Sequence, residues 1–346
     1  MTSIKGEFMK NTRVVLAKRP VGEPDDSCFE FITEESPTLQ DGQIRIKVLW
    51  LSLDPYMRGR MNDTKSYANP LQIGEVINGE SAGVVVESKS ALYKVGDYVT
   101  AHRGWQSVIV TDDSGPGLMK VDLNNGTLSA HLGVVGMPGR TAFFGLQELG
   151  KPQAGETLVV AAASGAVGSV VGQVAKILGL RVIGIAGGET KCRYVKEELG
   201  FDECIDYKAG NLDEELRKAC PKGIDIYFEN VGGVVAQTVA PLLNKGARVP
   251  ICGYVSSYNA EDITKVVTPF QIFKDLPQAP EHRFFLVGEW VERWPEATKQ
   301  LGQWVKEGRV KYRESVGEGL ENAPELFRGL LRGKNFGKQL VKVAEE

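Results

Sequence analysis

The chain has 346 residues, enough for two domains of ordinary size, and its 42% hydrophobic and 25% charged residues are typical of a globular protein. A formal net charge of −3 gives no support for a nucleic-acid partner, and no run of about 18 apolar residues predicts a membrane span. The five cysteines are scattered and form no CxxC pair, so we expect free thiols and a cytoplasmic protein. Residues 1–10 lack the features of a secretion signal and are expected to form a polar tail.

The N-terminal part of the chain, residues 13–130, has the pattern of short β-strands. Residues 44–48 alternate apolar and charged side chains, as a half-buried strand does. Residues 83–87 and 97–100 are runs of β-branched residues bounded by turn residues. Many short strands at close spacing predict a barrel or a sandwich rather than a βαβ unit.

Near Pro138 the pattern changes to alternating strands and helices. We expect strands at 157–163, 181–186, 203–206, 225–229 and 249–254, with helices at 167–178, 190–199 and 211–219. This order predicts a parallel sheet covered by helices on both faces. After Thr268 the pattern is less regular, and we expect helices at 294–307 and 323–332 and strands at 310–316 and 337–343.

The strongest local signal is the segment AAASGAVG at 161–168, which follows a predicted strand and opens a predicted helix. A dinucleotide-binding loop requires this context. Gly165 would let the backbone approach a pyrophosphate, and Gly168 would let the helix pack closely on the strand, while the N–H groups of the first helical turn favour phosphate. Because Ala163 replaces the first glycine of the usual triplet, a tight turn without a ligand stays open as the alternative.

The end of the second strand indicates which dinucleotide binds. An NAD site usually carries Asp or Glu there, bonded to the ribose 2′-hydroxyl. Here the tip is Gly187-Gly188, and Lys191 follows in the first turn of the next helix, where a cation can pair with the 2′-phosphate of NADPH. Glu189 is the main objection, since a carboxylate pointing at the ribose would favour NAD. The missing acid at the strand tip leads us to predict NADPH.

Further motifs, in order along nearly the whole chain, are similar to those of one family. They are LSLDPYMR (51–58), GRTAFFG (139–145), AASGAVG (162–168), YFENVGG (227–233), CGYVSSYN (252–259) and NFGK (335–338). On these motifs the chain resembles the medium-chain dehydrogenase/reductase superfamily. Within it, the chain is most similar to the zinc-free leukotriene B4 dehydrogenase/prostaglandin reductase group, which includes curcumin reductases and plant double-bond reductases.

The resemblance implies an α/β fold that combines a GroES-like β-barrel with a Rossmann domain, a doubly wound parallel sheet. The barrel domain would comprise residues 1–130 and 304–346, and the Rossmann domain residues 131–303. The resemblance also implies a homodimer and a substrate-lining segment that doubles as the dimer-edge strand, formed by Phe285, Leu286 and Val287. The implied NADPH contacts are Ser164, Gly165, Ala166, Val167, Gly168, Gly188, Lys191, Tyr207, Asn230, Cys252, Gly253, Tyr254, Tyr258 and Asn335. Lys191 and Tyr207 would flank the 2′-phosphate.

A metal site is argued against by the residues themselves. A catalytic zinc needs about three protein ligands, usually Cys and His. The position of the Gly-His-Glu motif of zinc alcohol dehydrogenases reads NGES at 78–81, without a histidine. His102, His131 and His282 lie far apart in the sequence, and none has a cysteine nearby. We therefore expect no metal.

Without a metal, the chemistry must suit hydride delivery alone, and a conjugated enone or enal is the substrate that fits. Hydride transfer to the β-carbon leaves an enolate, whose oxygen needs a hydrogen-bond donor. Tyr56 and Tyr258 are the candidate donors, with Tyr56 also contacting the substrate. Trp105 is a candidate apolar wall of the pocket, although core packing is the more common role of a tryptophan. A quinone reductase of the same superfamily and a non-catalytic NADPH-binding protein stay open as alternatives.

Overall fold

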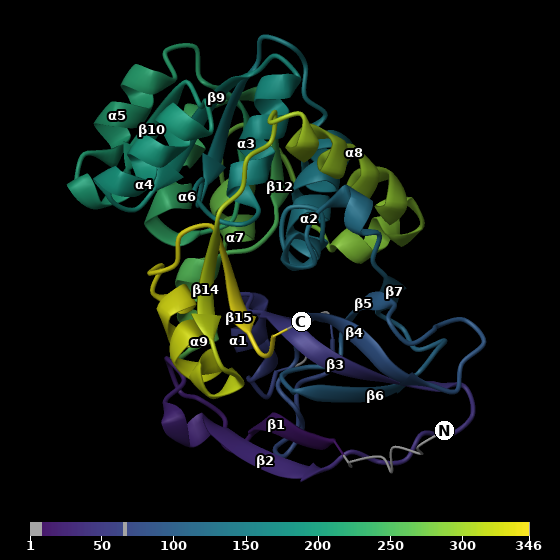
Figure 1. Ribbon diagram of the computed structural model, residues 1–346. Coiled ribbons are helices and arrows are strands. Elements are labelled where there is room, and N and C mark those ends of the chain that lie inside the picture. The colour runs from purple at the N-terminus through teal and green to yellow at the C-terminus, as the bar shows by residue number, and fades with distance from the viewer. Residues whose placement is uncertain (1–8, 65–67, 346) are drawn as a thin grey trace.

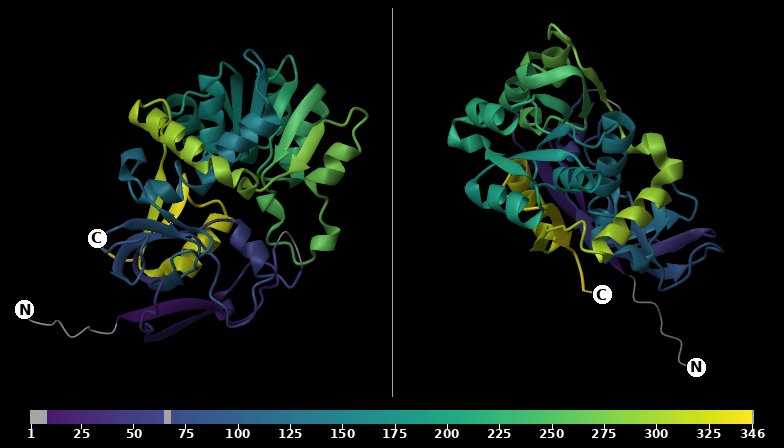
Figure 2. Two further views of the ribbon diagram at one scale, coloured as in Figure 1. Left: turned by 90° about the vertical axis from the view of Figure 1, so that its right-hand side faces the viewer. Right: turned by 90° about the horizontal axis from the view of Figure 1, so that it is seen from above.

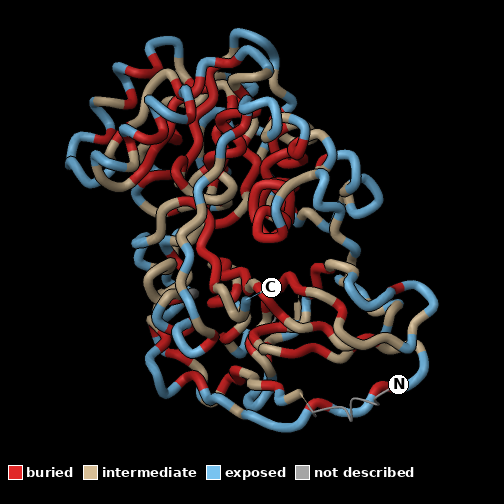
Figure 3. The backbone as a smooth tube through the Cα atoms, in the orientation of Figure 1, coloured by how far each residue is buried: buried red, intermediate tan, exposed pale blue. Residues whose placement is uncertain are grey.

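Two β-sheets divide the molecule into an α/β lobe and a β-rich lobe (Figure 1, Figure 2). The computed structural model describes residues 9–64 and 68–345. Most of the expected polar tail, residues 1–8, lies outside this range. In Figure 3 the buried backbone is concentrated at the centre of each lobe, and exposed segments surround it.

The α/β lobe is built on a parallel six-stranded sheet in the order β10-β9-β8-β11-β12-β13. Its strands are β8 (Thr157–Ala161), β9 (Arg181–Ala186), β10 (Glu203–Asp206), β11 (Ile224–Phe228), β12 (Leu243–Ile251) and β13 (Glu281–Phe284). The five residues of β8 are all buried, because helices cover both faces of the sheet. The direction of chain progression reverses between β8 and β11, and ligands of such sheets bind at the carboxyl ends of the strands at this point.

Each face of the parallel sheet has its own hydrophobic core. One face is covered by α2 (Met137–Phe144), α3 (Gly168–Ile177) and α8 (Trp294–Lys306), and the other by α5 (Leu212–Ala219), α6 (Gly233–Val239) and α7 (Pro269–Lys274). A short helix, α4 (Glu189–Arg193), follows β9 and continues as a π-helical turn, Tyr194–Glu198. The expected helix at 190–199 is thus present in two parts.

The β-rich lobe contains a seven-stranded sheet in the order β14-β15-β3-β4-β5-β7, with β6 also paired to β3. Its strands are β3 (Gln43–Ser52), β4 (Ser81–Ser88), β5 (Tyr98–Ala101), β6 (Val108–Asp112), β7 (Leu118–Lys120), β14 (Glu314–Glu318) and β15 (Lys338–Lys342). A separate hairpin is formed by β1 (Lys10–Leu16) and β2 (Phe29–Glu35). The predicted α/β class, a β-barrel-like domain with a doubly wound parallel sheet, is confirmed.

The C-terminal segment returns to the β-rich lobe after α8. There β15 pairs antiparallel with β3, and α9 (Ala323–Leu331) packs beside it. Position 304, expected as the boundary, lies inside α8, and Trp304, Val310 and Tyr312 pack on the core of the parallel-sheet lobe. The chain therefore changes lobe between Tyr312 and Glu314.

Two expected strands lie elsewhere in the structure. The strand expected at 310–316 begins only at Glu314, because the preceding residues pack on the other lobe and β14 can pair with β15 only from there. The edge strand expected at 285–287 is β13, Glu281–Phe284, and Val287 already begins a 3₁₀ segment.

Candidate functional site

The glycine loop lies at the point where the strand order reverses. Ala162 follows β8 with φ of +53°, so the backbone turns sharply there. A Cβ added to Gly168 would lie 2.3 Å from the carbonyl oxygen of Ala162, which means that only glycine allows α3 to begin this close to β8. Gly165 and Ala166 lie between these points, half-buried at the carboxyl end of β8. The loop has the geometry that a pyrophosphate requires.

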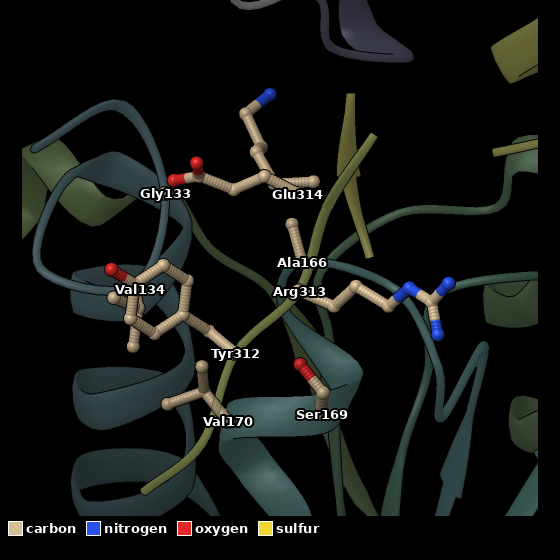
Figure 4. A pocket seen from close by; sticks show the side chains of 9 residues that line it. Gly133, Val134, Ala166, Ser169, Val170, Tyr312, Arg313 and Glu314 are labelled. Carbon is tan, nitrogen blue, oxygen red and sulfur yellow. The ribbon is translucent and has the colours of Figure 1, made fainter. Parts of the chain in front are cut away.

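The C-terminal segment that returns to the β-rich lobe after α8, called the crossing segment below, passes directly over this loop. The amide N–H of Gly337 donates to the carbonyl oxygen of Ser164 at 3.1 Å, and a β-bridge joins Gly165 to Gly337. Asn335 precedes the crossing, and its side-chain amide donates to the carbonyl oxygen of Gly337 at 2.8 Å. Figure 4 shows the adjoining cavity, where Ala166 and Ser169 of the glycine-loop side face residues 312–314 of the crossing segment. The glycine loop is thus held by both lobes.

A cluster of lysines lies at the tip of β9. Lys191, in α4, donates from Nζ to the carbonyl oxygen of Gly333 at 2.7 Å. Tyr207, which follows β10, is 45% exposed, and the ammonium of Lys208 lies 5.9 Å from the centre of its ring. A Cβ on Gly187 would lie 3.1 Å from the Tyr207 hydroxyl and 3.0 Å from Cε of Lys208, so both side chains lie over the glycine tip.

The charges at this tip favour an anion. Partial burial and then the nearby charge of Lys208 lower the pKa of Lys191. Within residues 9–64 and 68–345, neither lysine takes part in an ion pair. The carboxylate of Asp206 accepts from the amides of Gly188 (2.8 Å) and Lys208 (2.9 Å) through one oxygen, which ties the two loops together. Glu189 is exposed. Two cations this close together repel each other, and an anion between them would relieve that repulsion.

Lys208 was not predicted to contact the cofactor, although it ends the segment DYK (206–208), which also matches the family. A single lysine after a short strand is usually a surface residue. The signal that could have placed Lys208 near Lys191 was the predicted parallel sheet, because the carboxyl ends of β9 and β10 lie side by side in it. Residues that follow β10 therefore lie close to Lys191, which follows β9.

The loop after β11 carries Asn230 and a buried carboxylate. The Asn230 side chain donates to the carbonyl oxygen of Ala161 at 2.8 Å, across the point where the strand order reverses. Glu229 is completely buried, and its carboxylate accepts from the amides of Val231 (2.6 Å) and Gly232 (2.9 Å). Burial raises the pKa of Glu229 to about 7, although these two amides act in the opposite direction. Glu229 shapes the loop that presents Asn230.

The loop after β12 contains Cys252, Gly253, Tyr254 and Tyr258. The amide of Cys252 donates to the carbonyl oxygen of Glu229 at 2.9 Å, which joins this loop to the previous one. The Tyr258 hydroxyl accepts from the amide of Tyr254 at 3.4 Å, and a Cβ on Gly253 would lie 2.7 Å from it. The hydroxyl therefore lies over its own loop at the carboxyl edge of the sheet.

Tyr56 belongs to the other lobe, where it opens α1 (Tyr56–Arg60). Its ring stacks on His102 with centroids 6.4 Å apart. Arg58 is buried and donates to the carbonyl oxygen of Gly22 at 2.6 and 3.0 Å. A Cβ on Gly22 would lie 3.8 Å from the carbonyl oxygen of Asn259, the residue after Tyr258. The Tyr56 helix and the Tyr258 loop are thus connected through one intervening loop.

Two of the four apolar candidates, Trp105 and Phe285, lie in the cores rather than at a surface. Trp105 is fully buried, 5.9 Å from Phe29 and 5.6 Å from Phe327 between ring centroids. Phe285 is 3% exposed and contacts Phe228 and Trp290. Both residues pack against neighbouring aromatic rings, and the expectation that they line the substrate pocket stays a prediction. Leu286 is 39% exposed and Val287 is half-buried, so both can contact a ligand.

No group of three or more Cys, His, Asp or Glu side chains is placed to hold a metal ion within the described part of the chain. His102 stacks on Tyr56, while Nδ1 of His282 lies 2.9 Å from the carbonyl oxygen of Pro280. Of the helices in residues 9–64 and 68–345, none combines the length and the apolar character that crossing a bilayer requires.

Comparison with known proteins assigns this arrangement to a class. Residues 12–121 match the family described as the N-terminal domain of oxidoreductase, and residues 166–302 match the family described as zinc-binding dehydrogenase. The chain is 47% identical over 338 residues to the NADPH-dependent curcumin reductase of Escherichia coli (strain K12), covering 97% of each chain. It is 40% identical over 341 residues to prostaglandin reductase 1 of Bos taurus, covering 94% of this chain and 97% of that one.

A solved structure extends the likeness to three dimensions. CurA from Vibrio vulnificus in complex with NADPH has a TM-score of 0.90 and 46% identity, covering 97% of this chain and 100% of that chain. The chain belongs to the medium-chain dehydrogenase/reductase superfamily, in its zinc-free group with curcumin and prostaglandin reductases. The resemblance inferred from the motifs is confirmed, and the protein is an oxidoreductase.

Proposed function

We propose that this protein reduces the carbon–carbon double bond of α,β-unsaturated ketones and aldehydes with NADPH. The observation that carries the proposal is the pair Lys191 and Lys208 at the glycine tip of β9, beside a glycine loop that fits a pyrophosphate. The names of the relatives support it, since the Escherichia coli relative is an NADPH-dependent curcumin reductase and the Vibrio vulnificus structure contains NADPH.

The proposed cofactor site follows the carboxyl edge of the parallel sheet. Residues Ser164–Gly168 would receive the pyrophosphate, and Gly188, Lys191, Tyr207 and Lys208 would receive the 2′-phosphate. Asn230 and the segment 252–258 lie at the neighbouring strand ends, and Asn335 approaches from the crossing segment. When bound, NADPH supplies the hydride for the reduction.

The chain's own residues would orient the substrate and stabilise the charge that forms on it. A conjugated carbonyl that gains a hydride at its β-carbon becomes an enolate, with the negative charge on oxygen. We assign the hydroxyls of Tyr258 and Tyr56 to donate hydrogen bonds to that oxygen. Leu286 and Val287 would contact the apolar part of the substrate. The α-carbon then takes a proton, delivered through a tyrosine hydroxyl or water.

The experiment that tests this function compares three substrates with purified protein. NADPH oxidation is measured with a linear enone, with benzoquinone and with a saturated aldehyde, and the products are identified. A saturated ketone from the enone, formed faster than hydroquinone from benzoquinone, supports the proposal. Preference for benzoquinone would instead favour the quinone reductase, and NADPH binding without turnover would favour a non-catalytic role. The homodimer and the cytoplasmic location stay predictions, and light scattering tests the first of them.

A further inference from the structure

Two cysteines outside the proposed reaction lie on neighbouring elements, α4 and β10, beside the proposed 2′-phosphate site. Cys192 is in α4, next to Lys191, and Cys204 is the second residue of β10, two residues before Asp206. Both are free thiols, Cys192 being 9% exposed and Cys204 half-buried. Their side chains interact with each other, and neither forms a disulfide. Neither side chain has a role in the proposed hydride transfer.

The fold explains why these two thiols meet. In the parallel register of β9 and β10, Cys204 lies opposite Gly184, so the side chains at both positions point to the same face of the sheet. On that face a Cβ at Gly184 would lie 3.0 Å from Cγ1 of Val195. Val195 follows Cys192 by three residues on the same helical segment, so both lie on its inner side. Cys192 therefore packs onto the sheet above Cys204.

The two thiols are chemically unequal. The interaction with Cys204 lowers the pKa of Cys192, whereas the interaction with Cys192 and burial raise the pKa of Cys204 well above its ordinary value. Cys192 is thus the thiol that more readily forms a nucleophilic thiolate, and Cys204 keeps its proton. An acidic attacking thiol next to a second thiol is the arrangement of a redox-responsive pair.

We propose that Cys192 and Cys204 form an oxidisable dithiol, which a hydroperoxide converts to a disulfide that weakens NADPH binding. In the first step the Cys192 thiolate attacks the terminal peroxide oxygen, giving a sulfenic acid and releasing water or alcohol once the leaving oxygen takes a proton. In the second step the Cys204 sulfur attacks the Cys192 sulfur, the S–O bond breaks, and water leaves with the Cys204 proton. The two thiols together lose two electrons, and the peroxide gains these two electrons.

The effect on the cofactor follows from the neighbours of the pair. Forming the disulfide brings sulfurs from non-bonded contact to covalent distance, so α4 and β10 must shift relative to each other. Lys191 and Tyr207 are carried by these same elements, and Asp206 ties the amides of Gly188 and Lys208 together. This part of the inference rests on the proposed function, because it assumes that the 2′-phosphate binds at Lys191.

The test uses the full-length protein treated with a small excess of hydrogen peroxide and then digested with a glutamate-specific protease without reductant. Mass spectrometry should detect residues 190–197 linked to residues 204–214, and dithiothreitol should separate them. Isothermal titration should give a dissociation constant for NADPH at least about tenfold higher after oxidation, with reversal by dithiothreitol and little change for NADH.

Three variants make the result specific. Cys204→Ser should leave Cys192 as a sulfenic acid that dimedone traps, and Cys192→Ser should abolish the linked peptide. Cys220→Ser is the matched control, because Cys220 is buried on the opposite face of the sheet and burial raises its pKa to about 11. This variant should behave as the native protein.

Absence of the linked peptide, or a linked peptide without loss of NADPH affinity, overturns the proposal. The linked peptide is detected without cofactor, so its absence is distinct from failure of the 2′-phosphate assignment, which Lys191→Ala tests separately.

Discussion

Lys338 and Asp54 form a buried ion pair, 2.8 Å long, between residues that lie 284 positions apart. Lys338 also donates to the carbonyl oxygen of Leu53 at 2.7 Å, while its neighbour Gly337 binds the carbonyl oxygen of Ser164. Two consecutive residues of the crossing segment therefore fix the glycine loop and the turn that leads into Tyr56. This arrangement sets the position of the cofactor loop relative to the Tyr56 helix.

Breaking this pair should destabilise the protein strongly. The two side chains are only 4% and 8% exposed, so Lys338→Met would leave the Asp54 carboxylate buried without its partner. We expect a loss of about 3–5 kcal/mol in the free energy of unfolding, measured by urea denaturation. Lys151→Met is the control, because the Lys151–Glu281 pair is 55% and 64% exposed and should contribute less than about 1 kcal/mol. Equal losses for both variants would contradict the structural role of the buried pair.

The lysine pair at the tip of β9 should select NADPH over NADH. Lys191→Ala and Lys208→Ala each remove one charge-assisted contact to the proposed 2′-phosphate. Each should raise the dissociation constant for NADPH by about 10- to 100-fold and leave that for NADH nearly unchanged. Lys196→Ala is the control, since Lys196 pairs with Glu203 on the surface and should not alter either constant. A similar loss for both cofactors would show that these lysines do not contact the phosphate.

Replacing the Tyr258 hydroxyl should affect turnover rather than cofactor affinity. The Tyr258 hydroxyl accepts a hydrogen bond from the amide of Tyr254 at 3.4 Å, and loss of that bond in Tyr258→Phe should cost about 1 kcal/mol of stability. If the hydroxyl stabilises the enolate oxygen, kcat for an enone should fall by about 100-fold or more. NADPH affinity should stay within about threefold, as expected for an interaction made only in the transition state. Steady-state kinetics and isothermal titration test this, and an unchanged kcat would remove Tyr258 from the mechanism.

The sequence predicted the parallel sheet well because local patterns determine it. Arg181–Ala186 is a short, mostly apolar run that ends at a glycine pair, Glu203–Asp206 is a short segment before a turn, and both are strands with the expected bounds. The glycine loop was identified for the same reason, since all of its residues are consecutive. Local pattern was less informative at 310–316. There Val310 and Tyr312 pack on the core of the parallel-sheet lobe, so the strand begins only at Glu314.

The candidate site was only partly predictable, because much of it depends on contacts between distant segments. Lys208 meets Lys191 only because β10 lies beside β9, and Lys338 meets Asp54 only after the C-terminal segment has crossed between lobes. The sequence left two roles open for Trp105, an apolar wall of the pocket and, more commonly, core packing. Phe29 and Phe327, which bury it, come from segments that no local pattern connects to it.

The buried carboxyl group of Glu229 should make stability depend on pH. Its pKa is raised from 4.5 to about 7 in the folded protein, so the folded state holds this proton more tightly than the unfolded chain. This group therefore lowers the free energy of unfolding as the pH rises from about 4.5 to 7, by up to about 3 kcal/mol, and the loss is complete above pH 7. Glu229→Gln keeps an oxygen for the amides of Val231 and Gly232 but cannot ionise.

Melting temperatures between pH 5 and 8 test this account. Relative to the native protein, Glu229→Gln should gain stability as the pH rises, with most of the gain present at pH 8. The exposed Glu197→Gln should follow the native curve at every pH. Parallel curves for Glu229→Gln and the native protein would mean that Glu229 does not titrate in this range.

Isotopic labelling measures directly whether hydride reaches the β-carbon of a conjugated carbonyl, as the proposed function requires. The protein is given an enone and NADPH carrying deuterium at C4 of the nicotinamide ring, with each stereospecifically labelled form used in turn, and the product is analysed by NMR. We predict a saturated ketone with deuterium at the β-carbon from one of the two forms. Deuterium on a carbinol carbon, with the double bond intact, would contradict the proposed reaction.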